Sequence, residues 1–266
     1  MILLQGTVLP AQTPDVVPLP DDPRIRTGRL ANGLTYYVVK NPAQRGYADF
    51  AVAQKVGTVL EEQNQKGMFK MLELLSTRGT RNFTDSTIVK YLNSLGVGSK
   101  NIVFETGEDE TVYTISHVPI ANQNTMDSTL LILYNWMASI NIDEEDIAGA
   151  MPMLKKTLSE QCDAESRVES AIIRELYPRS PYAKGITPHQ INEIRSFSSK
   201  ELRNFYYNWC RPDLQAVFVV GDIDPVKVET QIKSIFATIP KPLKGEKRNH
   251  YSPKMVKGTK VVMGKD

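Results

Sequence analysis

One short stretch, Gly67 to Thr80 with the sequence GMFKMLELLSTRGT, constrains the fold of this chain more than any other. Its apolar residues recur at helical spacing around most of the circumference, which predicts a helix that is buried in a core and ends at Gly79. Lys70 and Glu73 interrupt this apolar surface one turn apart. A buried helix with a cation and an anion at this spacing holds either a structural ion pair or part of a site.

The composition is that of an ordinary globular protein, with 266 residues, 41% of them hydrophobic and 23% charged, and a formal net charge of +2. This length is enough for one large domain or two small ones. No dense basic face or stacking motif accompanies the small positive charge, so nucleic acid is not expected as a partner. The basic run at 244–248 is interpreted as a solvated linker, and no apolar run reaches the length of a membrane span.

Strand-like blocks are separated by turn signals. β-branched and aromatic residues at 34–40 follow an Asn-Gly turn and predict one strand, and 47–61 alternate as a second long strand. A turn at 107–109 lies between two β-rich runs, which predicts a hairpin. The best buried strand is expected at 214–220.

Helices are predicted between these strands from capping signals and apolar periodicity. The clearest pattern runs from Ile88 to Leu95 and is stopped by Gly96. Pro152 lies inside another predicted helix, where it removes a backbone hydrogen bond and costs about 3 kcal/mol unless the helix kinks or restarts. The residues expected to cap further helices are Asp127, Asp143, Thr187 (with Pro188 at the first helical position), Ser198 and Asp224.

The frame around Gly67 to Thr80 resembles the pitrilysin/insulinase family of zinc peptidases, the inverted zincins, which includes mitochondrial-processing-peptidase-like proteins. In that family a helix with the pattern G-x-x-H-x-x-E-H-x-x-x-x-G-T supplies two zinc ligands and a catalytic base. The resemblance implies an α+β fold, a mainly antiparallel sheet packed against several helices in a single unit. It extends from Asp22 to Pro240 through matching blocks at 28–41, 53–67, 109–116 and 209–224 and the final SIFATIP.

Placed on this sequence, the family motif puts Lys70 at the first ligand histidine and Leu74 at the second, and it retains the base as Glu73. The distal ligand glutamate falls at or beside Thr157. Neither lysine nor leucine replaces imidazole as a Zn²⁺ ligand, so all three metal ligands of the family are missing. The resemblance therefore implies four vestigial positions, with no catalytic residue, no metal ligand and no zinc cofactor in this chain.

Other residues of metal-binding type do not form a recognisable site. His117, His189 and His250 lack helical ligand spacing and are expected to be structural or exposed. Asp222 and Asp224 allow a metal hypothesis, but an Asp-Pro pair at this point is expected first to cap a helix.

The two cysteines and the chain start bear on the compartment. Cys162 and Cys210 have no C-x-x-C motif and are expected as buried free thiols, with one disulfide as the alternative. The apolar start, MILLQGTVLPAQ, lacks a positively charged leader and is interpreted as the remnant of a signal peptide. Together with the resemblance to exported bacterial family members, this predicts a periplasmic or secreted protein.

We expect an extended segment at 1–21, the peptidase-like domain at 22–242, and a linker at 243–266 that ends in a candidate first strand of a second, absent domain.

Two functions are consistent with these residues. The first is a catalytically inactive domain that acts as a non-catalytic subunit or as a peptide- or partner-binding module, with Lys70 and Glu73 paired in the old site. The second is an active zinc metallopeptidase completed by a partner chain or second domain. Family members usually enclose substrate between two tandem units, which implies a second peptidase-like domain or subunit as partner.

In the family, the stretch that corresponds to 103–105 is a sheet edge that holds substrate by strand addition. In this chain it is either such an edge or part of a plain core hairpin.

Overall fold

A computed structural model describes residues 22–84, 87–178, 180–183, 191, 192, 194, 197–242, 245–252, 259 and 261. Several predictions therefore lie outside the described residues. They are the extended segment at 1–21, the helix capped by Thr187, the position of His189, and all but two residues of the candidate strand at 256–263.

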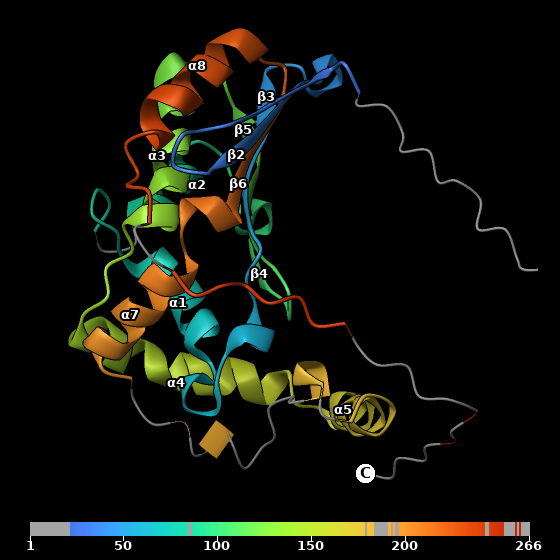
Figure 1. The fold of residues 1–266 in the computed structure, drawn as a ribbon. Helices are drawn as coiled ribbons and strands as arrows, with labels where there is room; N and C mark the ends of the chain where they lie inside the picture. The colour runs from blue at the N-terminus through green and yellow to red at the C-terminus, as the bar shows by residue number, and fades with distance from the viewer. Residues whose placement is uncertain are drawn as a thin grey trace, which may run out of the picture.

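In the described ranges, six strands form one mixed sheet in the order β1-β2-β6-β3-β5-β4 (Figure 1). Within this sheet β2 and β6 run parallel and the other neighbouring strands run antiparallel. The prediction of a mainly antiparallel sheet in an α+β unit is thus confirmed. The strands are β1 (Ile25–Arg29), β2 (Thr35–Lys40), β3 (Tyr47–Gln54), β4 (Ile102–Thr106), β5 (Thr111–Pro119) and β6 (Gln215–Gly221).

The burial pattern of the central strands shows that one face of the sheet packs against the core and the other face is only half-buried. Along β3 and β6, buried and half-buried residues alternate without interruption, as expected for strands that cover a core with one face only. The long strand predicted for 47–61 is wrong beyond Gln54. At Gly57 the chain approaches the β4–β5 turn so closely that a Cβ would lie 2.5 Å from the carbonyl oxygens of Gly107 and Glu108. The 3₁₀ turn η2 (Thr58–Leu60) follows.

Most of the predicted helices and caps are present. The side chains of Asp143, Ser198 and Asp224 accept hydrogen bonds from backbone N–H groups in the first turns of their helices. The helix expected to begin at Asp127 begins one turn earlier, because the side chain of Asn122 accepts the capping hydrogen bond. The helices are α1 (Met68–Arg78), α2 (Thr87–Ser94), α3 (Gln123–Ala138), α4 (Glu144–Glu160), α5 (Ala164–Leu176), α7 (Ser199–Trp209) and α8 (Pro225–Phe236).

Pro152 lies inside α4, which continues through it from Glu144 to Glu160. The helix therefore does not restart at the proline, and the missing backbone hydrogen bond is accommodated within one continuous element. None of the helices in the described ranges is both long and apolar enough to cross a bilayer.

The buried hydrophobic residues in the described part of the chain form two clusters. The first joins the packed face of the sheet to α2, α3 and α8, which lie on the same side of the strands in Figure 1, and it buries Phe50, Trp136 and Phe236 completely or nearly so. The second joins α1, α4 and α7 and includes Met71 and Leu154. Because α1 belongs to the second cluster and also touches β4, it lies where the two clusters meet.

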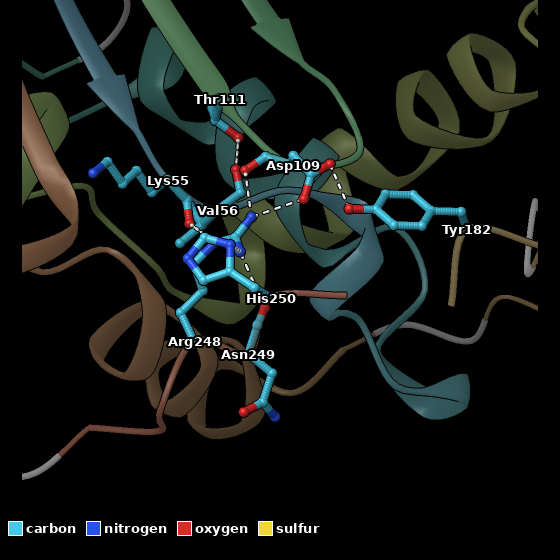
Figure 2. Close-up of polar contacts among 8 residues, drawn as sticks. All are labelled: Lys55, Val56, Asp109, Thr111, Tyr182, Arg248, Asn249 and His250. Atoms are coloured by element: carbon cyan, nitrogen blue, oxygen red, sulfur yellow. Dashed lines mark hydrogen bonds and ion pairs between the residues drawn. The ribbon is translucent and has the colours of Figure 1, made fainter. Parts of the chain in front are cut away.

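The described part of the segment after α8 folds back onto the domain. The interpretation of 244–248 as a solvated linker is wrong for Arg248, whose side chain is only 10% exposed. Its guanidinium donates hydrogen bonds to the backbone oxygens of Lys55 and Asp109 and pairs with the Asp109 carboxylate (Figure 2). These contacts are between segments far apart in sequence, which is why the basic run alone did not indicate them.

Candidate functional site

The helix α1 begins at Met68 because Gly67 turns the chain into it. Gly67 has a φ of 88°, a left-handed backbone conformation that favours glycine. The apolar side chains of Met68, Met71 and Leu75 are buried, as the periodicity predicted, and the helix ends just before Gly79. The residues between these buried positions are thereby presented to the neighbouring strand β4 and to α4.

Glu61 caps this helix, and the sequence analysis missed it. Its two carboxylate oxygens accept hydrogen bonds from the backbone N–H groups of Gly67 at 3.0 Å and Phe69 at 2.9 Å. The side chain is 5% exposed, and burial raises the pKa of Glu61 to about 7 against the opposing effect of these N–H groups. Glu61 lies in the stretch predicted as a long strand, so its pattern gave no sign of a capping role.

Lys70 and Glu73 form the predicted ion pair. The Nζ atom of Lys70 lies 2.6 Å from Oε1 of Glu73, and the two side chains are only 14% and 10% exposed. The hydroxyl of Thr106, at the end of β4, donates a hydrogen bond to Oε2 of Glu73 at 2.8 Å. Both oxygens of the carboxylate therefore have a protein donor, and one of these donors comes from the edge strand.

A cavity of about 330 Å³ adjoins this ion pair. It lies between the start of α1, the β4–β5 turn, the C-terminal end of α4 and the start of α5. A second hollow of about 310 Å³ follows β4 and shares Lys70, Thr106, Gly107 and Gln161 with the first. Lys70, whose ammonium group stands at the first ligand position of the family motif, thus lines two neighbouring hollows beside the edge strand.

The other two vestigial positions differ in their relation to this space. Leu74 is half-buried and packs against the second hydrophobic cluster. Thr157 is half-buried on α4, whereas among the described residues it is Gln161, one turn later, that lines both hollows with Lys70. The structure therefore brings Lys70, Glu73 and Gln161 to one place, and Thr157 does not line it.

The side chains at this place do not fit a zinc ion. Zn²⁺ takes imidazole, thiolate or carboxylate ligands, and in the described part of the chain no three histidine, cysteine, aspartate or glutamate residues lie together as a ligand group. Lys70 brings a positive charge to the first ligand position, and its amine already donates to Glu73, which is the one acidic residue of the motif. The side chains at this place therefore do not provide the ligands that a zinc ion requires.

The remaining candidate residues have other roles. His117 stacks on Tyr47 with ring centroids 3.9 Å apart, and it lines neither of the two hollows. Cys162 and Cys210 form no disulfide. Cys162 lines the cavity and is buried, while burial raises the pKa of the Cys210 thiol to about 12. Asp224 caps α8, as predicted.

Among the strands that the structure describes, β4 pairs with β5 alone and lies at the end of the strand order, so it is an edge of this sheet. Val103 on this strand is 38% exposed although it is apolar. The hairpin prediction is confirmed, and the edge runs alongside the second hollow.

Comparison with known families decides the identity. Residues 36–187, more than half of the chain, match the family described as insulinase (peptidase family M16), and residues 196–266 match the peptidase M16 inactive domain. The chain belongs to the insulinase family. The membership predicted from the motif frame is thereby confirmed.

Relatives of this insulinase-family chain are longer than it is. It is 27% identical over 239 residues to the probable zinc protease PqqL of Haemophilus influenzae, covering 88% of this chain and 26% of that protein. It is 31% identical over 203 residues to a zinc protease PQQL-like protein of Arabidopsis thaliana, covering 75% of this chain and 21% of that one. The chain thus spans about a quarter of the length of these curated relatives.

Solved structures share the fold. The first half of the periplasmic protease PqqL from Escherichia coli superposes with a TM-score of 0.79 at 22% identity, over 89% of this chain and 50% of that one. Pitrilysin gives a TM-score of 0.68 at 16% identity, over 89% of this chain and 25% of that one. At these identities the likeness establishes the fold, and the chemistry has to be argued from the residues of this chain.

Proposed function

We propose that this chain is a catalytically inactive insulinase-type domain that binds a peptide or a partner. The observation that carries the proposal is the ion pair of Lys70 and Glu73, 2.6 Å apart on α1. In the active enzymes of the family, the helix at this position holds a metal that activates a water molecule. Here the helix holds an ammonium group in place of the first ligand and a leucine in place of the second.

The state of Glu73 supports the absence of catalysis. A general base needs an oxygen within hydrogen-bond reach of the water that it deprotonates. Lys70 donates to one oxygen of Glu73 and Thr106 donates to the other. The retained glutamate therefore serves as a structural acceptor that connects α1 to β4, and its retention does not by itself argue for activity.

A binding role is supported by the surfaces around the ion pair. The edge strand β4 offers backbone hydrogen-bonding groups to an added strand, and the hollow beside it offers space for side chains. The face of the sheet opposite the helices is only half-buried along β3 and β6 and exposes the stacked rings of Tyr37 and Phe218. Since the relatives are several times longer than this chain, we infer that a second peptidase-like domain or subunit is the main partner.

A periplasmic or secreted location is part of the proposal. Its support is the likeness to a structure described as a periplasmic protease. Fractionation of the source cells with a compartment marker would test it, and recovery of the protein only with cytoplasmic markers would contradict it.

Metal content is the first test of the proposed function. Elemental analysis of the purified protein should find no stoichiometric zinc, and neither added Zn²⁺ nor a chelator should shift the melting temperature, because a metal that binds the native state would stabilise it. Peptide hydrolysis should be absent at every zinc concentration. Stoichiometric zinc together with hydrolysis that is lost in Glu73→Gln would instead establish the alternative, an active metallopeptidase.

The binding role has its own test. A fluorescent library of extended peptides is screened against the wild type, Val103→Asp and Val226→Asp. Val103 lies on the free edge and Val226 is a similarly exposed valine on α8, 38% and 57% exposed respectively. Binding that is weakened by Val103→Asp alone supports strand addition at β4. Equal weakening by both variants, or by neither, contradicts it.

A further inference from the structure

The described residues 245–252, named here the strap, are attached to the domain at three places. Glu246 accepts hydrogen bonds from Asn208 and Arg211, Tyr251 packs against the second hydrophobic cluster, and Arg248 contacts the β4–β5 turn.

The Nε of Arg248 donates to the backbone oxygen of Lys55 at 2.7 Å, and its Nη2 lies 2.7 Å from Oδ1 of Asp109 (Figure 2). Its Nη1 donates to the oxygen of Asn249 and lies 3.4 Å from Nδ1 of His250. With 10% of the side chain exposed, the guanidinium depends on these partners to compensate for its burial.

Asp109 connects the strap to a third segment. While Oδ1 accepts from Arg248, Oδ2 accepts a hydrogen bond of 2.6 Å from the hydroxyl of Tyr182, which Figure 2 shows on the side of Asp109 away from the strap. This bond raises the pKa of Tyr182 to about 12, so the phenol remains a donor at any physiological pH. One carboxylate at the tip of the β4–β5 turn thus holds two segments that are remote in sequence.

Tyr182 belongs to the wall of the cavity beside Lys70. It lies in the 3₁₀ turn η5 (Pro181–Ala183), which packs against α5, and Ser166 and Ser170 of α5 line the same cavity. On the opposite side, the cavity is lined by Gly107 and Glu108 of the β4–β5 turn. The bond between Tyr182 and Asp109 therefore joins two walls of the cavity at its rim.

The charges around this contact make Arg248 its counter-ion. The turn places Glu108 and Asp109 side by side, and Glu169 of α5 adds a third carboxylate across the cavity. Burial, and then Asp109 and Glu169, raise the pKa of Glu108, while the nearby charge of Lys66 lowers it. Arg248 pairs directly with Asp109, so its loss removes one of the cations that offset the repulsion between the carboxylates of the turn and of α5 and leaves Lys66 as the cation that acts on Glu108.

The tip of the turn has a second anchor on its other side. The backbone N–H groups of Thr58 and Val59 donate to the oxygens of Gly107 and Glu108, each at 3.0 Å. η2 also contacts η5. The turn therefore keeps its own anchor when Arg248 is lost, and the Tyr182–Asp109 bond is the contact between η5 and the tip of the turn that Arg248 supports.

We propose that the strap is a latch on the cavity: Arg248 holds Asp109, Asp109 holds Tyr182, and release of Arg248 opens the cavity between the β4–β5 turn and η5. The strap is thereby coupled to access to Lys70 and Gln161. This inference adds regulation to the proposed binding site and rests on that proposal only for the use of the cavity. Its test needs no ligand, so its failure would leave the proposed function standing.

Cys162 provides the measurement, because it is buried and lines the cavity. In the Cys210→Ser background it is the single cysteine of the chain, since the sequence has 2 in all. The rate at which it reacts with a thiol reagent then reports opening of the cavity. We expect Arg248→Ala to raise this rate about tenfold or more under conditions where the protein stays folded.

Two further variants complete the experiment. Arg24→Ala is the matched control, because it removes an Arg–Asp pair with Asp22 that is exposed and far from the cavity in sequence and contacts. Tyr182→Phe removes only the hydroxyl and leaves the strap in place, and we expect it to accelerate labelling as well. It keeps the proposal testable if Arg248→Ala folds poorly. Low denaturant concentrations separate local opening from global unfolding, because only the latter depends on them steeply.

Three results bear on the latch. Acceleration by both Arg248→Ala and Tyr182→Phe, but not by Arg24→Ala, supports it. Equal labelling rates in all variants overturn it. Acceleration that follows the global stability of each variant also overturns it, since Arg248 would then only stabilise the fold.

Discussion

The ammonium nitrogen of Lys70 lies 2.6 Å from a carboxylate oxygen of Glu73 on the same helix, one turn away. A pair with this spacing requires no long-range contact, because helix geometry alone places the two side chains on one stripe. Thr106 adds a bond from β4 to the other oxygen. The corresponding helix binds a metal in the family's active enzymes. In this chain the helix is stabilised by an internal ion pair.

Removal of the cation should destabilise the domain. In Lys70→Met the stem keeps its packing, but Glu73 is left nearly buried with Thr106 as its remaining donor, so we expect the free energy of unfolding to fall by about 2–3 kcal/mol. Lys70→Met/Glu73→Gln should recover part of the loss, because no unpaired charge remains. Urea denaturation measures both. Lys156→Met, which breaks an exposed pair with side chains 66% exposed, should change stability by less than about 0.5 kcal/mol; a comparable loss there would contradict this account.

Zinc binding should be recoverable by substitution. Lys70→His/Leu74→His places two imidazoles at i and i+4 beside Glu73, and we expect it to bind Zn²⁺ that the wild type does not bind. Because Gln161 lines the hollow with Lys70, adding Gln161→Glu should tighten binding more than adding Thr157→Glu. Titration with Co²⁺, followed by its absorption, and calorimetry with Zn²⁺ compare the variants. Tighter binding with Thr157→Glu than with Gln161→Glu would place the distal position at Thr157.

Stability should depend on pH through Glu61. Burial raises the pKa of Glu61 from 4.5 to about 7 in the folded protein, so its contribution is fully present below pH 4.5 and is lost as the pH rises through 7. The shift corresponds to about 3 kcal/mol. Glu61→Gln does not titrate and should flatten the dependence of the unfolding free energy between about pH 5 and pH 8. Denaturant titrations across this range measure the slope; an unchanged slope in Glu61→Gln would assign it to other groups.

Replacement of Pro152 should stabilise α4. The proline is exposed in the middle of a continuous helix, so Pro152→Ala restores a backbone N–H without loss of buried surface. We expect the free energy of unfolding to rise by about 1–3 kcal/mol. Thermal unfolding measures the change, with Met153→Ala as the control because that neighbour is 52% exposed. A lower melting temperature for Pro152→Ala would mean that the proline sets a local geometry that the domain requires.

The features predicted correctly from the sequence are those encoded locally. The ion pair of Lys70 and Glu73, the cap at Asp224 and the β4–β5 hairpin each depend on residues a few positions apart. The resemblance to the family also predicted the fold correctly, because the matching sequence blocks occur in the family's order along the chain. The placement of Thr157 beside the old site remains a prediction, since it needs the register of α4 against α1, which a helical pattern alone does not define.

The features that were missed depend on distant contacts. Glu61 caps α1 from a segment whose alternation indicated a strand, and only the fold shows that it reaches back to Gly67. Arg248 belongs to a basic run that is typical of a solvated surface, but its partner Asp109 lies 139 positions earlier in the chain. No periodicity connects such residues, so tertiary packing decides their roles.

The position of β6 in the sheet has a consequence for how the chain reaches its native state. β6 lies between β2 and β3, and Val219 is paired with Val38 on one side and Phe50 on the other. The two earlier strands therefore cannot complete their hydrogen bonding until the ribosome has made residues up to Gly221. Such non-local pairing slows folding and leaves strand edges exposed in the meantime. Nascent chains that stop before Gln215 should consequently depend on chaperones, whatever the stability of the finished domain.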